Sequence, residues 1–138
     1  MNIYFSGSIY GGRQKLDSYK KLVKKLKEIG NVLNEEVADD DVVEKEKNIN
    51  DCDVFESLVK RMDIADVIFA EITIPSLGVG YELGYADSHN KKIIAIYDKT
   101  LVPKVTTMLR GNKKIRIIPY IDINEIINNL EDIIKEEN

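Results

Sequence analysis

The residues best suited to chemistry in this chain surround one glutamate that follows a glycine-rich turn. Glu82 comes six residues after Ser76, with Gly78 and Gly80 between them. The two glycines leave the backbone open to a close ligand, and Ser76 adds a hydroxyl. We expect Glu82 to fall in the first turn of the next helix, where unpaired amides favour an ionised carboxylate. Such a group is a better nucleophile or charge stabiliser than proton donor, unless it only complements the helix dipole.

A second glycine-rich loop, residues 7–13, follows the first strand-like run. It offers backbone amides, the Ser8 hydroxyl and the Arg13 guanidinium at the start of a helix, a combination suited to a phosphate or a sugar. The patterns G-x-x-x-x-G-K-[ST] and G-x-G-x-x-G do not occur in it, which argues against nucleotide triphosphates and nicotinamide cofactors. Tyr4 lies in the strand before this loop. Its phenol reaches Glu82 if the side chain faces the same crevice; otherwise Tyr4 is a half-buried residue of the sheet.

Strand-like and helical segments alternate along the chain, which predicts a parallel α/β sheet covered on both faces by helices. The expected fold is a five-stranded, flavodoxin-like or Rossmann-like three-layer sandwich with strand order 2-1-3-4-5. Ligands of such sheets bind beyond the carboxyl ends of the strands at the switch point, here between the first and third strands, so both glycine-rich turns should face one crevice. The expected strands are residues 2–6, 31–34, 65–72, 93–97 and 115–120, and the main helices are 16–29, 51–62, the segment ending near 89, 105–109 and 123–134.

Composition limits the class of protein. The 138 residues suffice for a single domain, 1–138, and the net charge of −4 provides no basic footprint for nucleic-acid polymers. The one cysteine, Cys52, cannot form an internal disulfide, and no apolar run is long enough for a membrane span, so we expect a cytoplasmic protein. With His89 as the one histidine, we expect no metal and no cofactor. Residues 35–50 are charged and poorly periodic, and we expect a solvated loop there or, alternatively, a lid.

Several stretches of the chain strongly resemble the 2′-deoxynucleoside 5′-monophosphate N-glycosidases of the nucleoside 2-deoxyribosyltransferase superfamily. The most specific is the block P-S-L-G-V-G-Y-E-L-G at residues 75–84, and the resemblance covers most of the chain. The stretches concerned are residues 3–9, 11–13, 36–39, 65–67, 70–71, 75–84 and 108–111.

The resemblance implies hydrolysis of the N-glycosidic bond of a deoxynucleoside monophosphate, giving free base and deoxyribose 5-phosphate. It implies that Glu82 attacks C1′ to form a covalent glycosyl intermediate, which water then releases, while Tyr4 orients the carboxylate. It also implies a homodimer in which Thr106 reaches the phosphate in trans. The implied substrate-binding positions are Gly7, Ser8, Ile9, Gly11, Arg13, Ser76, Gly78, Thr106 and Met108.

The chain departs from the family pattern at two positions. Tyr10 stands where the family loop commonly has an arginine, and Leu58 stands where an acid usually assists departure of the base. Glu36 or Asp39, at the end of the second strand, is the candidate for a replacement acid. Two alternatives therefore accompany the hydrolase: a deoxyribosyltransferase that passes the sugar between bases, and a catalytically impaired module that binds nucleotides without turnover.

Overall fold

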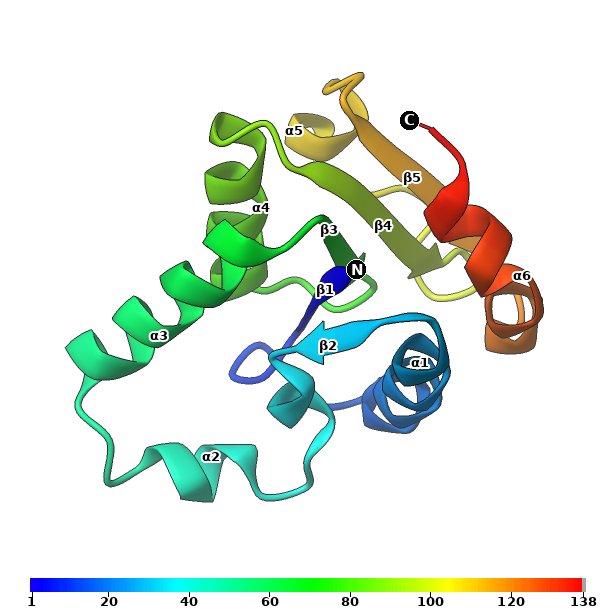
Figure 1. Ribbon diagram of the computed structural model, residues 1–138. Helices are drawn as coiled ribbons and strands as arrows, with labels where there is room; N and C mark the ends of the chain where they lie inside the picture. Colours follow the sequence, from blue (N-terminus) through cyan, green and yellow to red (C-terminus); the bar gives the residue numbers. More distant parts are fainter. Residues whose placement is uncertain (138) are drawn as a thin grey trace.

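Strands and helices alternate from one end of the chain to the other, as the sequence predicts (Figure 1). The computed structural model describes residues 1–137. The strands are β1 (Asn2–Gly7), β2 (Asn31–Leu33), β3 (Val67–Glu71), β4 (Lys92–Asp98) and β5 (Ile115–Tyr120). The helices are α1 (Leu16–Ile29), the 3-10 helix η1 (Glu35–Ala38), α2 (Val42–Glu46), α3 (Asp51–Ile64), α4 (Leu77–Ser88), α5 (Thr107–Arg110) and α6 (Ile123–Lys135).

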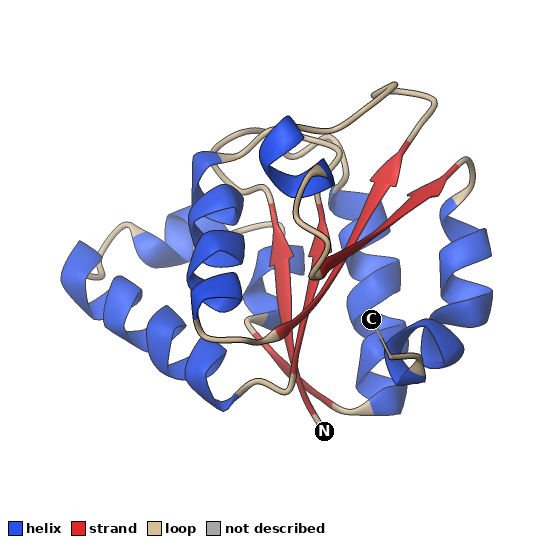
Figure 2. Cartoon of the chain, turned by 90° about the horizontal axis from the view of Figure 1, so that it is seen from above, coloured by secondary structure: helices blue, strands red, loops and turns tan. Residues whose placement is uncertain are grey.

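The five strands form one parallel sheet in the order β2-β1-β3-β4-β5, which confirms the predicted fold class. Helices α1 and α6 cover one face, and α3 and α4 cover the other, so the chain has three layers (Figures 1 and 2). The central strand β3 is buried at every residue because both of its faces lie under helices. The carboxyl ends of β1 and β3 are adjacent, with Gly7 opposite Glu71.

The segment at residues 35–50 is more ordered than we expected from its charge. Instead of one solvated loop it contains η1 and α2, because η1 packs against α1 and β1, and α2 packs against η1, which buries three apolar side chains. The segment is too short for helical periodicity to be visible in the sequence, so only the folded chain shows these two turns of helix. The buried side chains are those of Val37, Ala38 and Val42.

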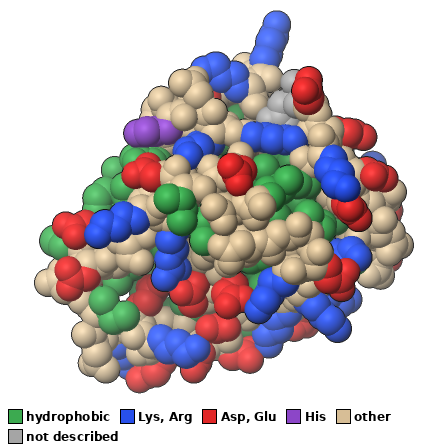
Figure 3. Space-filling view, viewed as in Figure 1, with side chains coloured by type: hydrophobic (Ala, Val, Ile, Leu, Met, Phe, Trp, Pro, Cys, Tyr) green, Lys and Arg blue, Asp and Glu red, His purple; other side chains and the backbone are tan. Residues whose placement is uncertain are grey.

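Charged side chains of both signs are mixed on the face of the molecule seen in Figure 3, with no large basic patch there. None of the described helices combines the length and the apolar character needed to cross a membrane. Within residues 1–137, His, Cys, Asp and Glu side chains form no group of three that could hold a metal ion.

Candidate active site

The two glycine-rich turns meet at the switch point between β1 and β3. A side chain at Gly11 would place its Cβ 2.4 Å from the Pro75 carbonyl oxygen and 2.8 Å from the Ser8 Oγ, so only glycine allows this approach. The turn after β1 and the turn after β3 therefore form one continuous wall of a cleft. The predicted positions Gly7, Ile9, Gly11, Ser76 and Gly78 all line that cleft.

Helix α4 positions Glu82, but not in the way that the sequence suggests. The helix begins at Leu77, and the Ser76 hydroxyl caps it by accepting the Val79 N–H at 3.3 Å. Glu82 is thus the sixth residue of the helix and lies in its second turn, so the expectation of a first-turn carboxylate was wrong. The field of the helix end acts within the first turn, and it cannot be what keeps Glu82 ionised.

Strand β1 supplies the polar partners of Glu82. The Ser6 hydroxyl donates to Glu82 Oε2 at 2.7 Å. Tyr4 lies two residues earlier on the same face of the strand and is fully buried; its hydroxyl has no hydrogen-bond partner within bonding geometry among the described residues. The sequence analysis did not single out Ser6, although the alternation of side chains from Tyr4 would have placed it on this face.

Burial dominates the electrostatics of this carboxyl. Removal from water raises the pKa of Glu82 from 4.5 to about 7, while the hydroxyls of Ser6 and, more weakly, Tyr4 counteract the rise. Burial, followed by the nearby charge of Glu82, also raises the pKa of the Tyr4 phenol. Near neutral pH, Glu82 is thus close to a balance between its neutral and ionised forms.

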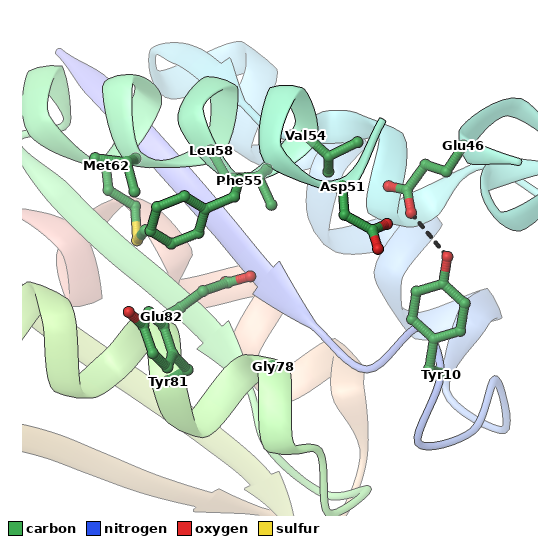
Figure 4. A pocket seen from close by; sticks show the side chains of 11 residues that line it. Tyr10, Glu46, Asp51, Val54, Phe55, Leu58, Met62, Gly78, Tyr81 and Glu82 are labelled. Atoms are coloured by element: carbon green, nitrogen blue, oxygen red, sulfur yellow. Dashed lines mark hydrogen bonds between the residues drawn. The ribbon is translucent and has the colours of Figure 1, made fainter. Parts of the chain in front are cut away.

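Glu82 lies where two lobes of the cleft join. One lobe, of about 410 Å³, runs along the two glycine-rich turns and is called the loop lobe here. The other, of about 330 Å³, lies between α3 and α4 and is called the aromatic lobe (Figure 4). Its wall includes Phe55 and Tyr81, whose rings meet edge to face at 6.3 Å. The residues that line both lobes are Tyr10, Glu46, Val54, Leu58, Gly78 and Glu82.

Polar groups of the residue 7–13 loop differ in their availability to a ligand. The Ser8 hydroxyl is buried and has no hydrogen-bond partner among the described residues. Arg13 instead uses its guanidinium on backbone carbonyls, bonding Ser8 O at 3.2 Å and Asp39 O at 2.7 Å. The Tyr10 hydroxyl donates to Glu46 at 3.0 Å and so connects this loop to α2 across the cleft (Figure 4).

The structure places the acids differently from the sequence analysis. Glu36 is paired with Arg61 at 2.9 Å, and Asp39 is paired with Lys45 at 2.9 Å; neither lines the two lobes around Glu82. Leu58 does line both lobes. Besides Glu82, the carboxylates that line the aromatic lobe with Leu58 are those of Glu46 and Asp51. The sequence did not reveal them because their place depends on how the end of α2 and the start of α3 meet at the cleft.

Thr106 and Met108 lie outside this cleft, in a separate groove of about 620 Å³ beside the start of α4. The groove is markedly apolar and open. Met108 is 81% exposed, and Leu77 on the facing turn is 96% exposed. Within one chain these residues are therefore on the far side of the residue 75–80 turn from Glu82.

Comparisons with known proteins show which proteins this chain is similar to. A family model described as nucleoside 2-deoxyribosyltransferase matches residues 3–114. A 5-hydroxymethyl-dUMP N-hydrolase of Danio rerio is 41% identical over 137 residues, covering 99% of this chain and 94% of that protein. The protein of the same name from Esox lucius is 42% identical over 114 residues, covering 80% of this chain and 79% of its own. The CMP N-glycosidase BcmB of Clostridium botulinum has the same fold, with a TM-score of 0.73 at 18% identity over 96% of this chain and 99% of its own.

Proposed function

Since the chain belongs to the nucleoside 2-deoxyribosyltransferase family, we propose that it hydrolyses the N-glycosidic bond of 2′-deoxynucleoside 5′-monophosphates. The products are a free base and deoxyribose 5-phosphate. The observation that carries this proposal is the place of Glu82, a carboxylate at the junction of two lobes with a hydroxyl bonded to one of its oxygens. The N-hydrolase names of the two relatives support the same reaction.

Glu82 is the nucleophile in this proposal. Ser6 holds Oε2, which leaves Oε1 to attack C1′. As the new C–O bond forms, the C1′–N bond breaks, and the base leaves with its electron pair and takes up a proton. Water then attacks C1′ of the glycosyl ester, which frees the sugar phosphate and regenerates the carboxylate. A 2′-deoxy sugar eases the first step because no electron-withdrawing hydroxyl opposes the positive charge that develops at C1′.

The two lobes suit the two ends of such a substrate. The 5′-phosphate fits the loop lobe, where Ile9 and Gly11 of the residue 7–13 loop and the capped end of α4 offer backbone amides, with Gly78 open above them. The base fits the aromatic lobe, where it can stack on Phe55 or Tyr81. Placing the two ends in this way brings C1′ to Glu82. Glu46 and Asp51 are then the acids nearest to the base, in place of an acid at Leu58.

We further propose that a homodimer is the active form and that Thr106 acts in trans. The apolar groove around Met108 and Leu77 supports this arrangement, because two copies that cover it would hide exposed hydrophobic surface. The single sheet supports one domain over residues 1–138. The single free cysteine, Cys52, which is exposed, supports a reducing, cytoplasmic compartment.

Transfer of deoxyribose between bases is a second candidate, favoured by the charge of the cleft. The described residues that line the two lobes include no Lys or Arg, whereas Glu46 lines both. A negative charge at that place repels a phosphate dianion and suits an unphosphorylated deoxynucleoside, the substrate of a transferase.

One panel of reactions separates these candidates. The protein is incubated with deoxynucleoside 5′-monophosphates and with the matching deoxynucleosides, each with and without a second free base, and the products are resolved by chromatography. Free base from the monophosphates supports the hydrolase, whereas a new nucleoside formed from the added base supports the transferase. Glu82→Ala should lose either activity, and Glu56→Gln, an exposed acid on α3, should keep it. Equal release by the parent and Glu82→Ala would disprove the role of Glu82.

A further inference from the structure

A buried polar group of side chains lies behind the residue 7–13 loop, on the face of the sheet opposite to Glu82. The proposed reaction uses none of these residues directly, because none of them lines the two lobes. Among them Tyr19 is fully buried on α1 and is the member that touches the loop backbone. The buried polar group consists of Ser8, Tyr19, Glu71, Thr73, Asp98 and Tyr120. The partly exposed Lys15 pairs with Asp98 at its edge.

The ring of Tyr19 fits beneath the start of the loop. It packs edge to face on Phe5, with ring centroids 5.7 Å apart. A Cβ at Gly7 would come within 3.0 Å of Tyr19 Cζ, so the tip of the ring already fills the space under that residue. The ring therefore supports the loop at Gly7, where β1 ends, and its hydroxyl reaches the N–H of Ser8.

Both backbone polar groups of Ser8 are held from this side. The Ser8 N–H donates to the Tyr19 hydroxyl at 2.9 Å in a buried bond, and the Ser8 carbonyl accepts from Arg13 at 3.2 Å. The Arg13 guanidinium also lies over the Tyr19 ring, 5.8 Å from its centroid. The peptide of Ser8 is thus fixed at both ends while its side-chain hydroxyl stays buried without a partner, between Gly11 and the turn after β3.

The Tyr19 phenol keeps its proton throughout the working range of an enzyme. Burial, with the nearby charge of Glu71, raises its pKa to about 12, against a smaller lowering by the Ser8 N–H and by Arg13. Its oxygen is therefore a neutral acceptor for Ser8 at every pH at which the reaction would be measured.

We propose that Tyr19 is a positioning residue: by holding the Ser8 peptide it aims the backbone amides of Ile9 and Gly11, which line the loop lobe, at the 5′-phosphate. It thereby sets the preference for phosphorylated over free deoxynucleosides. The inference rests on the proposed function, because it takes the loop lobe as the phosphate subsite. Its specific content is that the hydroxyl of Tyr19 affects the phosphate end of the substrate and leaves the chemistry at C1′ unchanged.

The test compares 5-hydroxymethyl-dUMP with its unphosphorylated deoxynucleoside in the parent and in Tyr19→Phe. The variant keeps the ring and loses only the hydrogen bond to Ser8. We expect kcat/KM for the monophosphate to fall about tenfold through KM, with kcat retained, because a lost buried hydrogen bond affects binding here and not the transition state alone. The deoxynucleoside should be cleaved at the parent's rate. A purely structural role would weaken both substrates equally and would contradict the proposal.

Tyr120→Phe is the matched control. Tyr120 is also buried in this group and its hydroxyl also lies near Glu71, but it has no hydrogen-bond partner by geometry among the described residues. Removal of the Tyr120 hydroxyl should leave the ratio of kcat/KM for the two substrates unchanged. If Tyr120→Phe lowers the ratio of kcat/KM for the monophosphate to kcat/KM for the deoxynucleoside as much as Tyr19→Phe does, the assignment to Tyr19 is overturned.

Binding measurements keep the inference separate from the proposed function. Calorimetry on the Glu82→Gln background, with and without Tyr19→Phe, gives the affinities for the same two compounds without turnover. If the parent releases no base, the proposed function fails; a phosphate-specific loss of affinity of about tenfold would still support the role of Tyr19. An unchanged affinity for the monophosphate in the double variant would refute it.

Discussion

Replacing Ser6 by alanine should displace the pH dependence of the reaction toward higher pH. The Ser6 hydroxyl donates to Glu82 Oε2 at 2.7 Å in partly buried surroundings, and it favours the ionised form. A hydrogen bond to a charged acceptor is worth about 1.5–3 kcal/mol. Since about 1.4 kcal/mol corresponds to one pH unit of pKa, its loss should raise the pKa of Glu82 by about 1–2 pH units.

The measurement is kcat/KM for base release as a function of pH, because this ratio reports the groups of the free enzyme. The parent's Glu82 has a pKa of about 7. Below that pH the carboxyl is protonated and cannot attack, so kcat/KM should fall about tenfold per pH unit, and above it kcat/KM should be level. In Ser6→Ala the same limb should lie at about pH 8–9.

Ser88→Ala is a suitable control for this experiment. Ser88 lies on the same helix, α4, but it is exposed and donates to the Tyr85 carbonyl at 2.7 Å. Removal of the Ser88 hydroxyl should give the same pH profile of kcat/KM as the parent. An acid limb that stays in place in Ser6→Ala, or that moves to lower pH, would refute the view that a buried carboxylate bonded by Ser6 is the nucleophile.

Three further changes have defined outcomes. Glu82→Gln should abolish base release yet raise the free energy of unfolding above pH 7, by at most about 3 kcal/mol in urea denaturation. The folded-state pKa of Glu82 lies above the ordinary 4.5, so the parent loses stability as the pH rises from 4.5 to about 7. An equal or lower stability of the variant above pH 7 would contradict this. Ser76→Ala should lower the melting temperature through the loss of about 1 kcal/mol from the cap of α4, and an unchanged melting temperature would show that the cap contributes nothing. Met108→Glu should yield a monomer in analytical ultracentrifugation with little activity, whereas a stable active dimer would exclude the groove as the interface.

The strand order and the crevice could be predicted because they depend on patterns that extend over many residues. Alternating apolar segments fix a parallel sheet, and the topology then brings the turn after β1 beside the turn after β3. The pattern left open whether Tyr4 faces the crevice or is half-buried in the sheet; in the structure Tyr4 is fully buried on the α3 and α4 side, the side on which Ser6 bonds Glu82. No chemistry of single residues was needed for this part.

The parts that could not be predicted depend on single local contacts. Gly78 and Gly80 are poor helix formers, which made a late start of α4 the natural expectation, but the Ser76 cap allows the helix to include both. Arg13 was expected to face a ligand and instead bonds two backbone carbonyls. Glu46 reaches the cleft only because α2 folds across it and Tyr10 meets it there.

The openness of the aromatic lobe affects which reaction follows the first bond cleavage. Phe55 is 50% exposed and Tyr81 is 62% exposed, so the departing base has a direct way into solvent while the sugar phosphate stays in the other lobe. Bulk water and any second base can then both enter the vacated lobe and compete to attack C1′. Because water is present at a concentration that no free base reaches in a cell, an open lobe of this kind would commit the proposed glycosyl intermediate to hydrolysis. A mutation that shields the lobe should then shift the proposed nucleophile, Glu82, toward transfer.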